Sequence, residues 1–456
     1  MSDLRQRKLK DNTSTPHIST RSISLKQPRR LKKVFILLIV LVLCATYFMG
    51  LFAGQTQLFD GIAKSLGYES VYHYAVIIDA GSSGSRVLAY KFRVPFTVFS
   101  QPNLDLVEEY FEQSKPGLSS YADDPEKGAD TIVQLIKKAE FLTPLEKRRA
   151  TPLIVRATAG LRLLPKEKAQ QLLDYVARAI APLGYDVGPH SVEIMDGSDE
   201  GIFIWYTVNL LHSLMNDETM AALDLGGGST QITYQLSDSE AADFPPEDRH
   251  VVPAGRNVTL YTHSYLNLGL LAARYGIFRM EAADNGTSEL VSVCVDPIVQ
   301  REPWTYGNQQ YRVSGAPRPE GMKREAAYER CHEVVRRYAL RTLRRGPPRP
   351  PRANVAAMSY FYDVAADAGL IDVMRGGTVS AAQYRAAAVR ACSAANVEQP
   401  WACVDLAFVT ALLRDAYAIG DHDAVSLFKK VHGHEVSWAL GLAYTTVMNR
   451  ITTAAA

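Results

Sequence analysis

The stretch Val76–Arg86 reads VIIDAGSSGSR, an apolar run that ends in Asp79 and continues into glycines and serines. A second stretch, Met220–Tyr234, reads MAALDLGGGSTQITY and repeats the order of apolar strand, Asp224, glycine-rich turn and hydroxyl residues. Glycine lets the backbone approach an anion, and the N–H groups and hydroxyls of such a turn donate to phosphate oxygens. An aspartate beside that turn would repel phosphate unless it held a divalent cation. The two turns therefore predict one polyphosphate and one metal ion enclosed between two domains.

Neither turn fits the common nucleotide-binding motifs. No Gly-Lys-Ser/Thr follows, as a Walker loop requires, and neither turn reads G-x-G-x-x-G, as a dinucleotide site does. The alternative is a pair of tight turns in which each aspartate caps a helix. The repetition of the whole pattern favours phosphate binding.

The rest of the chain has the composition of a globular protein. Of its 456 residues, 47% are hydrophobic and 21% charged, and the net charge of +2 gives no indication of nucleic-acid binding. From Tyr74 to Ile194, strand-like runs alternate with helical stretches, which predicts an α/β fold. The proline- and arginine-rich segment Arg341–Ala356 interrupts regular structure.

The N-terminus predicts a membrane anchor. Residues 1–33 form a basic arm, and the run Val34–Ala53 contains no charged residue. About twenty apolar residues cross the hydrocarbon core of a bilayer, and the basic arm is expected on the cytoplasmic side. A cleaved signal peptide and a core helix are the alternatives, but both flanking arm and apolar run are long for a signal peptide. We therefore expect a single-pass type II protein.

Cysteines and glycosylation motifs agree with a lumenal location. Besides Cys44 in the apolar run, four cysteines permit three pairings, and neighbours in the sequence suggest Cys294–Cys331 and Cys392–Cys403. Asn257 and Asn285 each begin an N-x-Thr glycosylation motif.

Five motifs occur together in one order. They read DAGSSGSR, ATAGLR, SDEGIFIW, LDLGGGSTQI and HSYLNLGLLAAR. In order and spacing they resemble the conserved regions of the apyrase family, which comprises the ecto-nucleoside triphosphate diphosphohydrolases and the Golgi guanosine/uridine diphosphatases. The resemblance runs from about residue 74 to residue 442.

The resemblance implies a fold and a domain organisation. It implies two ribonuclease-H-like α/β domains of the actin and sugar-kinase superfamily, with the active-site cleft between them. We expect a basic arm (1–33), an anchor (34–53), a stalk (54–73), domain I (74–196 and 425–456) and domain II (197–424).

The resemblance also assigns roles to residues at matching positions. Glu200 matches the general base, and Ser229 and Gln231 match residues that orient the attacking water. Asp79 and Asp224 match the carboxylates that hold Ca²⁺ or Mg²⁺ through water, with Mn²⁺ a further candidate. The expected phosphate- and nucleotide-binding residues are Ser82, Ser83, Gly84, Ser85, Thr158, Gly226, Gly227, Gly228, Tyr360 and Phe361.

Three features favour the lumenal diphosphatase branch of this family. They are the single anchor, the sequence Gly84-Ser85-Arg86 in the first turn, and the small number of lumenal cysteines. The expected function is metal-dependent hydrolysis of UDP and GDP to monophosphates in the Golgi or endoplasmic reticulum. The alternative is a broad-specificity apyrase, acting on tri- and diphosphates at the cell surface or outside the cell. The sequence leaves the oligomeric state open.

Overall fold

The computed structural model describes residues 29–48, 65–66, 71–94, 104–215, 218–254, 256–282, 284, 286–323, 326–348, 351 and 354–455. Most of the basic arm, residues 49–53 of the apolar run, most of the stalk, and Asn285 lie outside the described residues.

The chain divides into two units, Met1–Leu66 and Gly67–Ala456. In the first unit, helix α1 (Arg29–Phe48) includes the first part of the apolar run. Among the residues that the structure describes, no helix is both long enough and apolar enough to cross a membrane.

The second unit begins with a five-stranded mixed sheet of order β3-β2-β1-β4-β5. Strand β1 pairs antiparallel with β2 and parallel with β4, and β4 in turn pairs parallel with β5. The strands are β1 (Val71–Ala80), β2 (Ser85–Val94), β3 (Asp105–Ser114), β4 (Leu153–Ala157) and β5 (Val192–Ile194).

A seven-stranded sheet repeats this arrangement. Its order is β14-β15-β13-β6-β7-β9-β8, and β6 pairs antiparallel with β7 and parallel with β13, as β1 does with β2 and β4. The strands are β6 (Ala221–Leu225), β7 (Ser229–Gln235), β8 (Arg249–Pro253), β9 (Asn257–Leu266), β13 (Val355–Ser359), β14 (Gly377–Val379) and β15 (Val425–Leu427). The α/β prediction is confirmed, and each glycine-rich stretch is the turn between the first two strands of a sheet.

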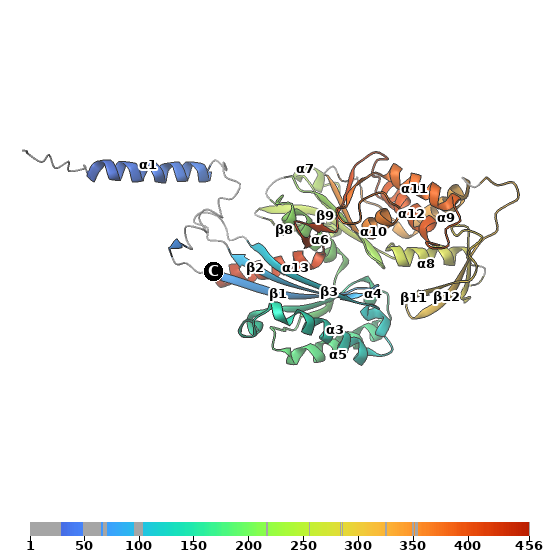
Figure 1. The fold of residues 1–456 in the computed structure, drawn as a ribbon, viewed down its shortest axis with the longest axis horizontal. Helices are drawn as coiled ribbons and strands as arrows, with labels where there is room; N and C mark the ends of the chain where they lie inside the picture. Colours follow the sequence, from blue (N-terminus) through green and yellow to red (C-terminus); the bar gives the residue numbers. More distant parts are fainter. Residues whose placement is uncertain are drawn as a thin grey trace, which may run out of the picture. The chain divides into compact units, whose positions relative to one another are not determined.

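The apolar run of β1 is buried on both faces, which explains why it does not alternate with polar residues. Val76, Ile78 and Ala80 pack with α3 (Pro125–Ala139) and α5 (Lys166–Ile180). Ala75 and Ile77 belong to a second core, formed with α6 (Gly197–Leu211), α13 (Trp438–Ala455) and residues of the seven-stranded sheet. Figure 1 shows α3 and α5 along one face of the first sheet.

A third core lies around the seven-stranded sheet and the helices near it, which Figure 1 shows gathered as α8, α9, α11 and α12. The remaining helices are α4 (Ala159–Arg162), α7 (Asp238–Ala241), α8 (Leu270–Glu281), α9 (Ala326–Leu343), α10 (Tyr360–Asp367), α11 (Ala381–Ser393) and α12 (Ala402–Ala411). The remaining strands are β10 (Glu289–Ser292), β11 (Glu302–Tyr306), β12 (Gln309–Gly315), β16 (Lys430–Val431) and β17 (His434–Glu435). Short 3₁₀ helices cover Leu118–Tyr121, Glu140–Leu142, Leu145–Ala150, Ala181–Leu183 and Pro246–Asp248, and a π-helical turn covers Leu412–Ala416.

The C-terminal segment belongs to both halves of the second unit. Strand β15 joins the seven-stranded sheet, whereas α13 packs against α6 and β1. The exact domain boundaries stay a prediction.

Candidate active site

The two glycine-rich turns have the same backbone geometry. The N–H of Gly81 donates to the carbonyl of Gly84 at 3.1 Å, and the N–H of Gly226 donates to the carbonyl of Ser229 at 3.0 Å. In each hairpin the aspartate stands one residue before the last position of the first strand, at Asp79 and Asp224.

The two turns and α4 are packed closely together. A Cβ atom on Gly227 would lie 2.5 Å from the Oγ of Ser82, and one on Gly228 would lie 2.8 Å from the Cβ of Ala159. Because real Cβ atoms do not approach other heavy atoms so closely, only glycine fits these two positions without displacement. The turns therefore meet, as their repetition in the sequence predicted.

A cleft of about 360 Å³ opens beside the turns. Most of the residues expected at the site line it: Asp79, Ser82, Ser83, Thr158, Glu200, Asp224, Gly226, Gly227, Gly228, Ser229 and Tyr360. One cleft is thus lined by the ends of β1 and β6, the turn after β4 and the first turn of α6.

Glu200 lies in the first turn of α6, a helix capped by the side chain of Asp196, which accepts a hydrogen bond from the N–H of Ser198. The Glu200 side chain accepts hydrogen bonds from Arg162 and, at 3.0 Å, from Nε2 of Gln231. The same nitrogen lies 2.8 Å from Oγ of Ser229 and 3.0 Å from Oγ of Ser264. The three residues expected to act on water therefore form one connected group.

The carboxylates of the cleft bind protons more tightly than usual. Burial raises the pKa of Glu200 to about 8, while Arg162 opposes the shift and Asp224 and Asp79 add to it. Burial likewise raises the pKa of Asp224 to about 6, against a hydrogen bond from Ser359. A cation near these groups would favour their ionised forms.

Asp79 and Asp224 each keep an oxygen available to a ligand. Oδ1 of both residues is buried and has no hydrogen-bond partner among the described residues. The other carboxylate oxygen of Asp79, Oδ2, accepts a hydrogen bond from Nη1 of Arg86 at 2.8 Å. Buried carboxylate oxygens without donors fit a hydrated divalent cation, because hard cations prefer oxygen ligands and their water would donate to these atoms.

Four expected residues lie away from the surface of the cleft. Phe361 is fully buried in the core around the seven-stranded sheet, so it does not face the cleft, whereas its neighbour Tyr360 does and hydrogen bonds Ser83. Gly84 and Ser85 are also not among the lining residues. Gln231 reaches the cleft only through Glu200 and Ser229.

The structure adds residues that the sequence interpretation did not assign. Arg162 and Ser264 contact Glu200 or its partner Gln231, and both lie inside motifs that marked the family, ATAGLR and HSYLNLGLLAAR. Their place in those two motifs is the feature of the sequence that could have identified them as site residues. Further polar residues that line the cleft include Arg86, Gln113, Lys115, Ser359, Asp363, Lys429, Glu435 and Ser437.

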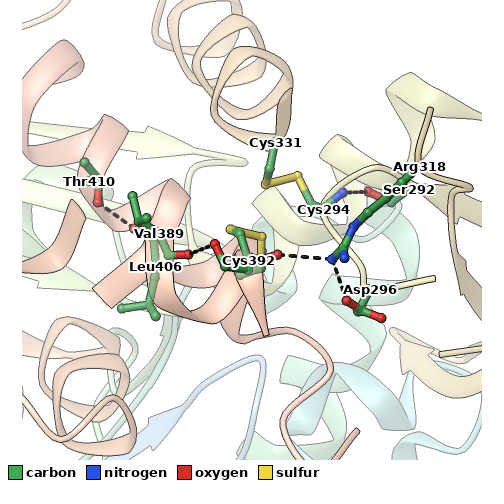
Figure 2. Close-up of a disulfide and its surroundings, with 11 residues drawn as sticks. Ser292, Cys294, Asp296, Arg318, Cys331, Val389, Cys392, Leu406 and Thr410 are labelled. Carbon is green, nitrogen blue, oxygen red and sulfur yellow. Dashed lines mark hydrogen bonds and ion pairs between the residues drawn. A yellow bond between two sulfur atoms is a disulfide. The ribbon is translucent and has the colours of Figure 1, made fainter. Parts of the chain in front are cut away.

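Both disulfide pairings are confirmed. Cys294 is bonded to Cys331 and Cys392 to Cys403. The two bonds are neighbours, since the sulfur atoms of Cys331, Cys392 and Cys403 lie within 4.8 Å of one another. Figure 2 shows Arg318 beside them, donating to Asp296 at 2.6 Å and to the carbonyl of Cys392 at 3.3 Å. Because these cysteines form disulfides, they are not metal ligands.

Asn257, the first residue of β9, is exposed, as a glycosylated asparagine must be. Its use as a glycan acceptor stays a prediction, and Asn285 lies outside the described residues.

Comparison with solved structures supports the fold. Nucleoside triphosphate hydrolases from Neospora caninum superpose with a TM-score of 0.57, at 15% sequence identity, over 87% of this chain and 98% of theirs.

Relatives found by comparing sequences are more similar to this chain in sequence than these hydrolases are. The chain is 34% identical over 404 residues to the nucleoside-diphosphatase uda-1 of Caenorhabditis elegans, covering 82% of this chain and 81% of the relative. It is 36% identical over 434 residues to the human nucleoside diphosphate phosphatase ENTPD5, covering 90% of this chain and 96% of the relative. Residues 67–454 match the GDA1/CD39 (nucleoside phosphatase) family, so the resemblance expected from the five motifs is confirmed. The chain belongs to the GDA1/CD39 family of nucleoside phosphatases.

Proposed function

We propose that this protein hydrolyses nucleoside diphosphates, UDP and GDP among them, to the monophosphate and inorganic phosphate, with a divalent cation as cofactor. One observation carries the proposal. A buried carboxylate, Glu200, shares a cleft with two glycine-rich turns and is hydrogen-bonded to Gln231. The names of the relatives as nucleoside diphosphatases agree with it.

The turns bind the phosphates. Gly226, Gly227 and Gly228 form one side of the site for the diphosphate, and the backbone N–H groups of Gly227 and Gly228 donate to it, since the N–H of Gly226 closes the turn by donating to the carbonyl of Ser229. The hydroxyls of Ser82, Ser83 and Thr158 serve the other. Donors fixed on a rigid hairpin need no reorganisation when charge develops on the phosphate oxygens, and this lowers the barrier to phosphoryl transfer.

Glu200 acts as the general base. It takes a proton from a water molecule that Ser229 holds, while Gln231 orients Glu200 and Ser229 through its hydrogen bonds to both, and the water oxygen bonds to the terminal phosphorus. The bond from that phosphorus to the bridging oxygen breaks, and the bridging oxygen leaves with the nucleoside monophosphate. No covalent intermediate with the protein is needed.

Asp79 and Asp224 would hold the divalent cation through its water shell. The unpartnered Oδ1 atoms described above support this assignment. When bound, the cation neutralises charge on the phosphate oxygens. Ca²⁺ and Mg²⁺ both suit carboxylate and water ligands, and Mn²⁺ is a further candidate.

Tyr360 is the candidate for contact with the nucleoside. It lines the cleft and hydrogen bonds Ser83 of the first turn, and both contacts support its assignment to the nucleotide site. The repeated strand order supports two ribonuclease-H-like domains with the nucleotide between them.

We also propose that residues 34–53 anchor the protein as a single-pass type II protein, with the second unit in the lumen of the Golgi or endoplasmic reticulum. The charge-free apolar run and the preceding basic arm support this orientation, and the two disulfides agree with an oxidising compartment. Protease treatment of intact microsomes tests it. The second unit should be protected until detergent is added, and digestion without detergent would exclude this topology.

The activity itself is tested by measuring phosphate release from UDP, GDP and ATP, with Ca²⁺ or Mg²⁺ and with EDTA. Glu200→Gln should bind nucleotide but lose turnover by roughly two or more orders of magnitude, the usual scale for a positioned base. The matched control is Asp199→Asn, an exposed carboxylate in the same helical turn that does not line the cleft. Near-normal turnover of Glu200→Gln would exclude Glu200 as the base, and no release from any nucleotide would exclude the function.

A further inference from the structure

The side chains of Arg162 and Glu200 form a largely buried ion pair between α4 and α6. The guanidinium Nη2 donates to Oε2 of Glu200, and the exposed fractions of the two side chains are 17% and 8%. Arg162 is not among the residues that line the cleft. Arg162 therefore contacts the carboxylate on the side away from the cleft and does not reach the space where a substrate would lie.

Both donors to Glu200 use the same oxygen. Nε2 of Gln231 also donates to Oε2, at 3.0 Å. Among the described residues, no donor reaches Oε1. A carboxylate oxygen without a donor keeps its lone pairs free to accept a proton. Since Glu200 lines the cleft and its Oε2 already accepts both hydrogen bonds, Oε1 is the oxygen left to accept a proton from water there.

The position of Arg162 is built into the packing around it. Its Nη1 lies 3.4 Å from Oγ of Ser264 on β9. A Cβ atom on Gly197, the first residue of α6, would lie 2.6 Å from the same nitrogen. Glycine at position 197 thus leaves room for the guanidinium between α6 and β9.

We propose that Arg162 is a positioning residue for hydrolysis: it binds Oε2 of Glu200 and so leaves Oε1 as the atom that takes the proton from the attacking water. This inference rests on the proposed function, because it assumes that Glu200 is the base.

The charges around Glu200 support this role. Asp79 at the end of β1 and Asp224 at the end of β6 both disfavour its ionised form, as does burial, and Arg162 favours that form. The neighbouring strands β7 and β9 face it with Gln231 and Ser264, which do not titrate. Removing the guanidinium would therefore raise the pKa of Glu200 further.

The test compares Arg162→Met and Arg162→Lys with the wild-type full-length protein in pH profiles of kcat/KM for UDP. Arg162→Met should lower kcat by about ten- to a hundredfold near pH 7, the scale of a misplaced catalytic group. Its profile should move to higher pH by about one unit or more, as expected when an opposite charge beside a carboxylate is lost. KM should change by less than about twofold, and Arg162→Lys should recover part of the rate, since it restores the charge without the fork geometry.

Arg156→Met is the matched control. The side chain of Arg156 has an exposed fraction of 15%, forms an ion pair with Glu193 and donates to the carbonyl of His190 at 2.9 Å, all outside the cleft. Its loss should leave the pH profile unchanged.

The outcomes separate the two proposals. A large rise in KM with an unshifted profile in Arg162→Met would assign Arg162 to phosphate binding, and a wild-type profile would remove it from the reaction. If Glu200→Gln is inactive in either of these cases, only the inference on Arg162 is overturned. If Glu200→Gln is active, the proposed mechanism itself is wrong. Should Arg162→Met not fold, Arg162→Lys decides: a wild-type pH profile together with a wild-type rate overturns the inference.

Discussion

Gly228 in the second glycine-rich turn lies against Ala159 of α4, so close that a Cβ atom on Gly228 would lie 2.8 Å from the Cβ of Ala159. Ala159 directly follows Thr158, one of the predicted phosphate ligands, and is itself buried. One methyl group added at position 228 would therefore change the distance between the two sides of the cleft.

Gly228→Ala should push the second turn away from α4 and lower kcat for UDP by about ten- to a hundredfold, because displacements near 1 Å in a phosphoryl-transfer site cost about that much. The double variant Gly228→Ala/Ala159→Gly removes the opposing methyl group and should recover much of the rate. The control is Gly188→Ala, since a Cβ there meets no atom within 4 Å. Equal losses in the single and double variants would show that the Ala159 contact is not the cause.

Stability should depend on pH through Glu200. Its pKa is about 8 in the folded protein and near 4.5 when the chain is unfolded, so the folded state binds the proton more tightly. The resulting stabilisation is complete below pH 4.5 and is lost as the pH rises towards 8. In EDTA, the free energy of unfolding should therefore fall between pH 6 and pH 8 by roughly 2 kcal/mol more in the wild type than in Glu200→Gln.

Urea unfolding at the two pH values measures this difference. Added Ca²⁺ should reduce it, because a cation near the carboxylates favours their ionised forms. Parallel pH dependence of the two proteins in EDTA would contradict the raised pKa.

The two disulfides should differ in their contribution to stability. The bonds close segments with sequence separations of 37 and 11 residues. On the loop-entropy model, replacing Cys294 and Cys331 by alanine should cost about 4 kcal/mol, and replacing Cys392 and Cys403 about 3 kcal/mol. Because the two bonds are neighbours, removing both should not give the sum of these values. Denaturant unfolding of the three variants measures this, and a larger loss from the 11-residue segment would contradict the loop-length argument.

Diphosphates should be better substrates than triphosphates. In the proposed mechanism, the terminal phosphorus of a bound diphosphate lies against the water that Glu200 and Ser229 contact. A triphosphate would then have to shift its nucleoside outward by one phosphate and lose contacts such as the one proposed for Tyr360. We expect kcat/KM for UDP and GDP to exceed that for UTP and ATP, by up to about a hundredfold. Activity should disappear in EDTA. Equal or higher efficiency on ATP would favour the broad-specificity apyrase and leave the fold unchanged.

Several parts of the site could be predicted from short stretches of sequence. A strand that ends in aspartate and a glycine-rich turn is defined by neighbouring residues, so the two hairpins at Asp79 and Asp224 appear as the motifs indicated. The place of Glu200 in the first turn of a helix is also a local property. The disulfide pairing followed from proximity along the chain. Each of these depends on backbone geometry over a few tens of residues at most.

Other features depend on how distant elements pack, and no local pattern contains them. Tyr360 and Phe361 are neighbours in the sequence, but successive residues on a helix point about 100° apart, so the packing of α10 alone sends Phe361 into the core. Arg162 reaches Glu200 only because α4 and α6 meet beside β9, where Gly197 leaves space for the guanidinium. The sequence thus determined which chemical groups the protein carries and on which turns and helices they lie. The tertiary structure decided which of them touch, because the direction of a side chain is set by the face that its element buries.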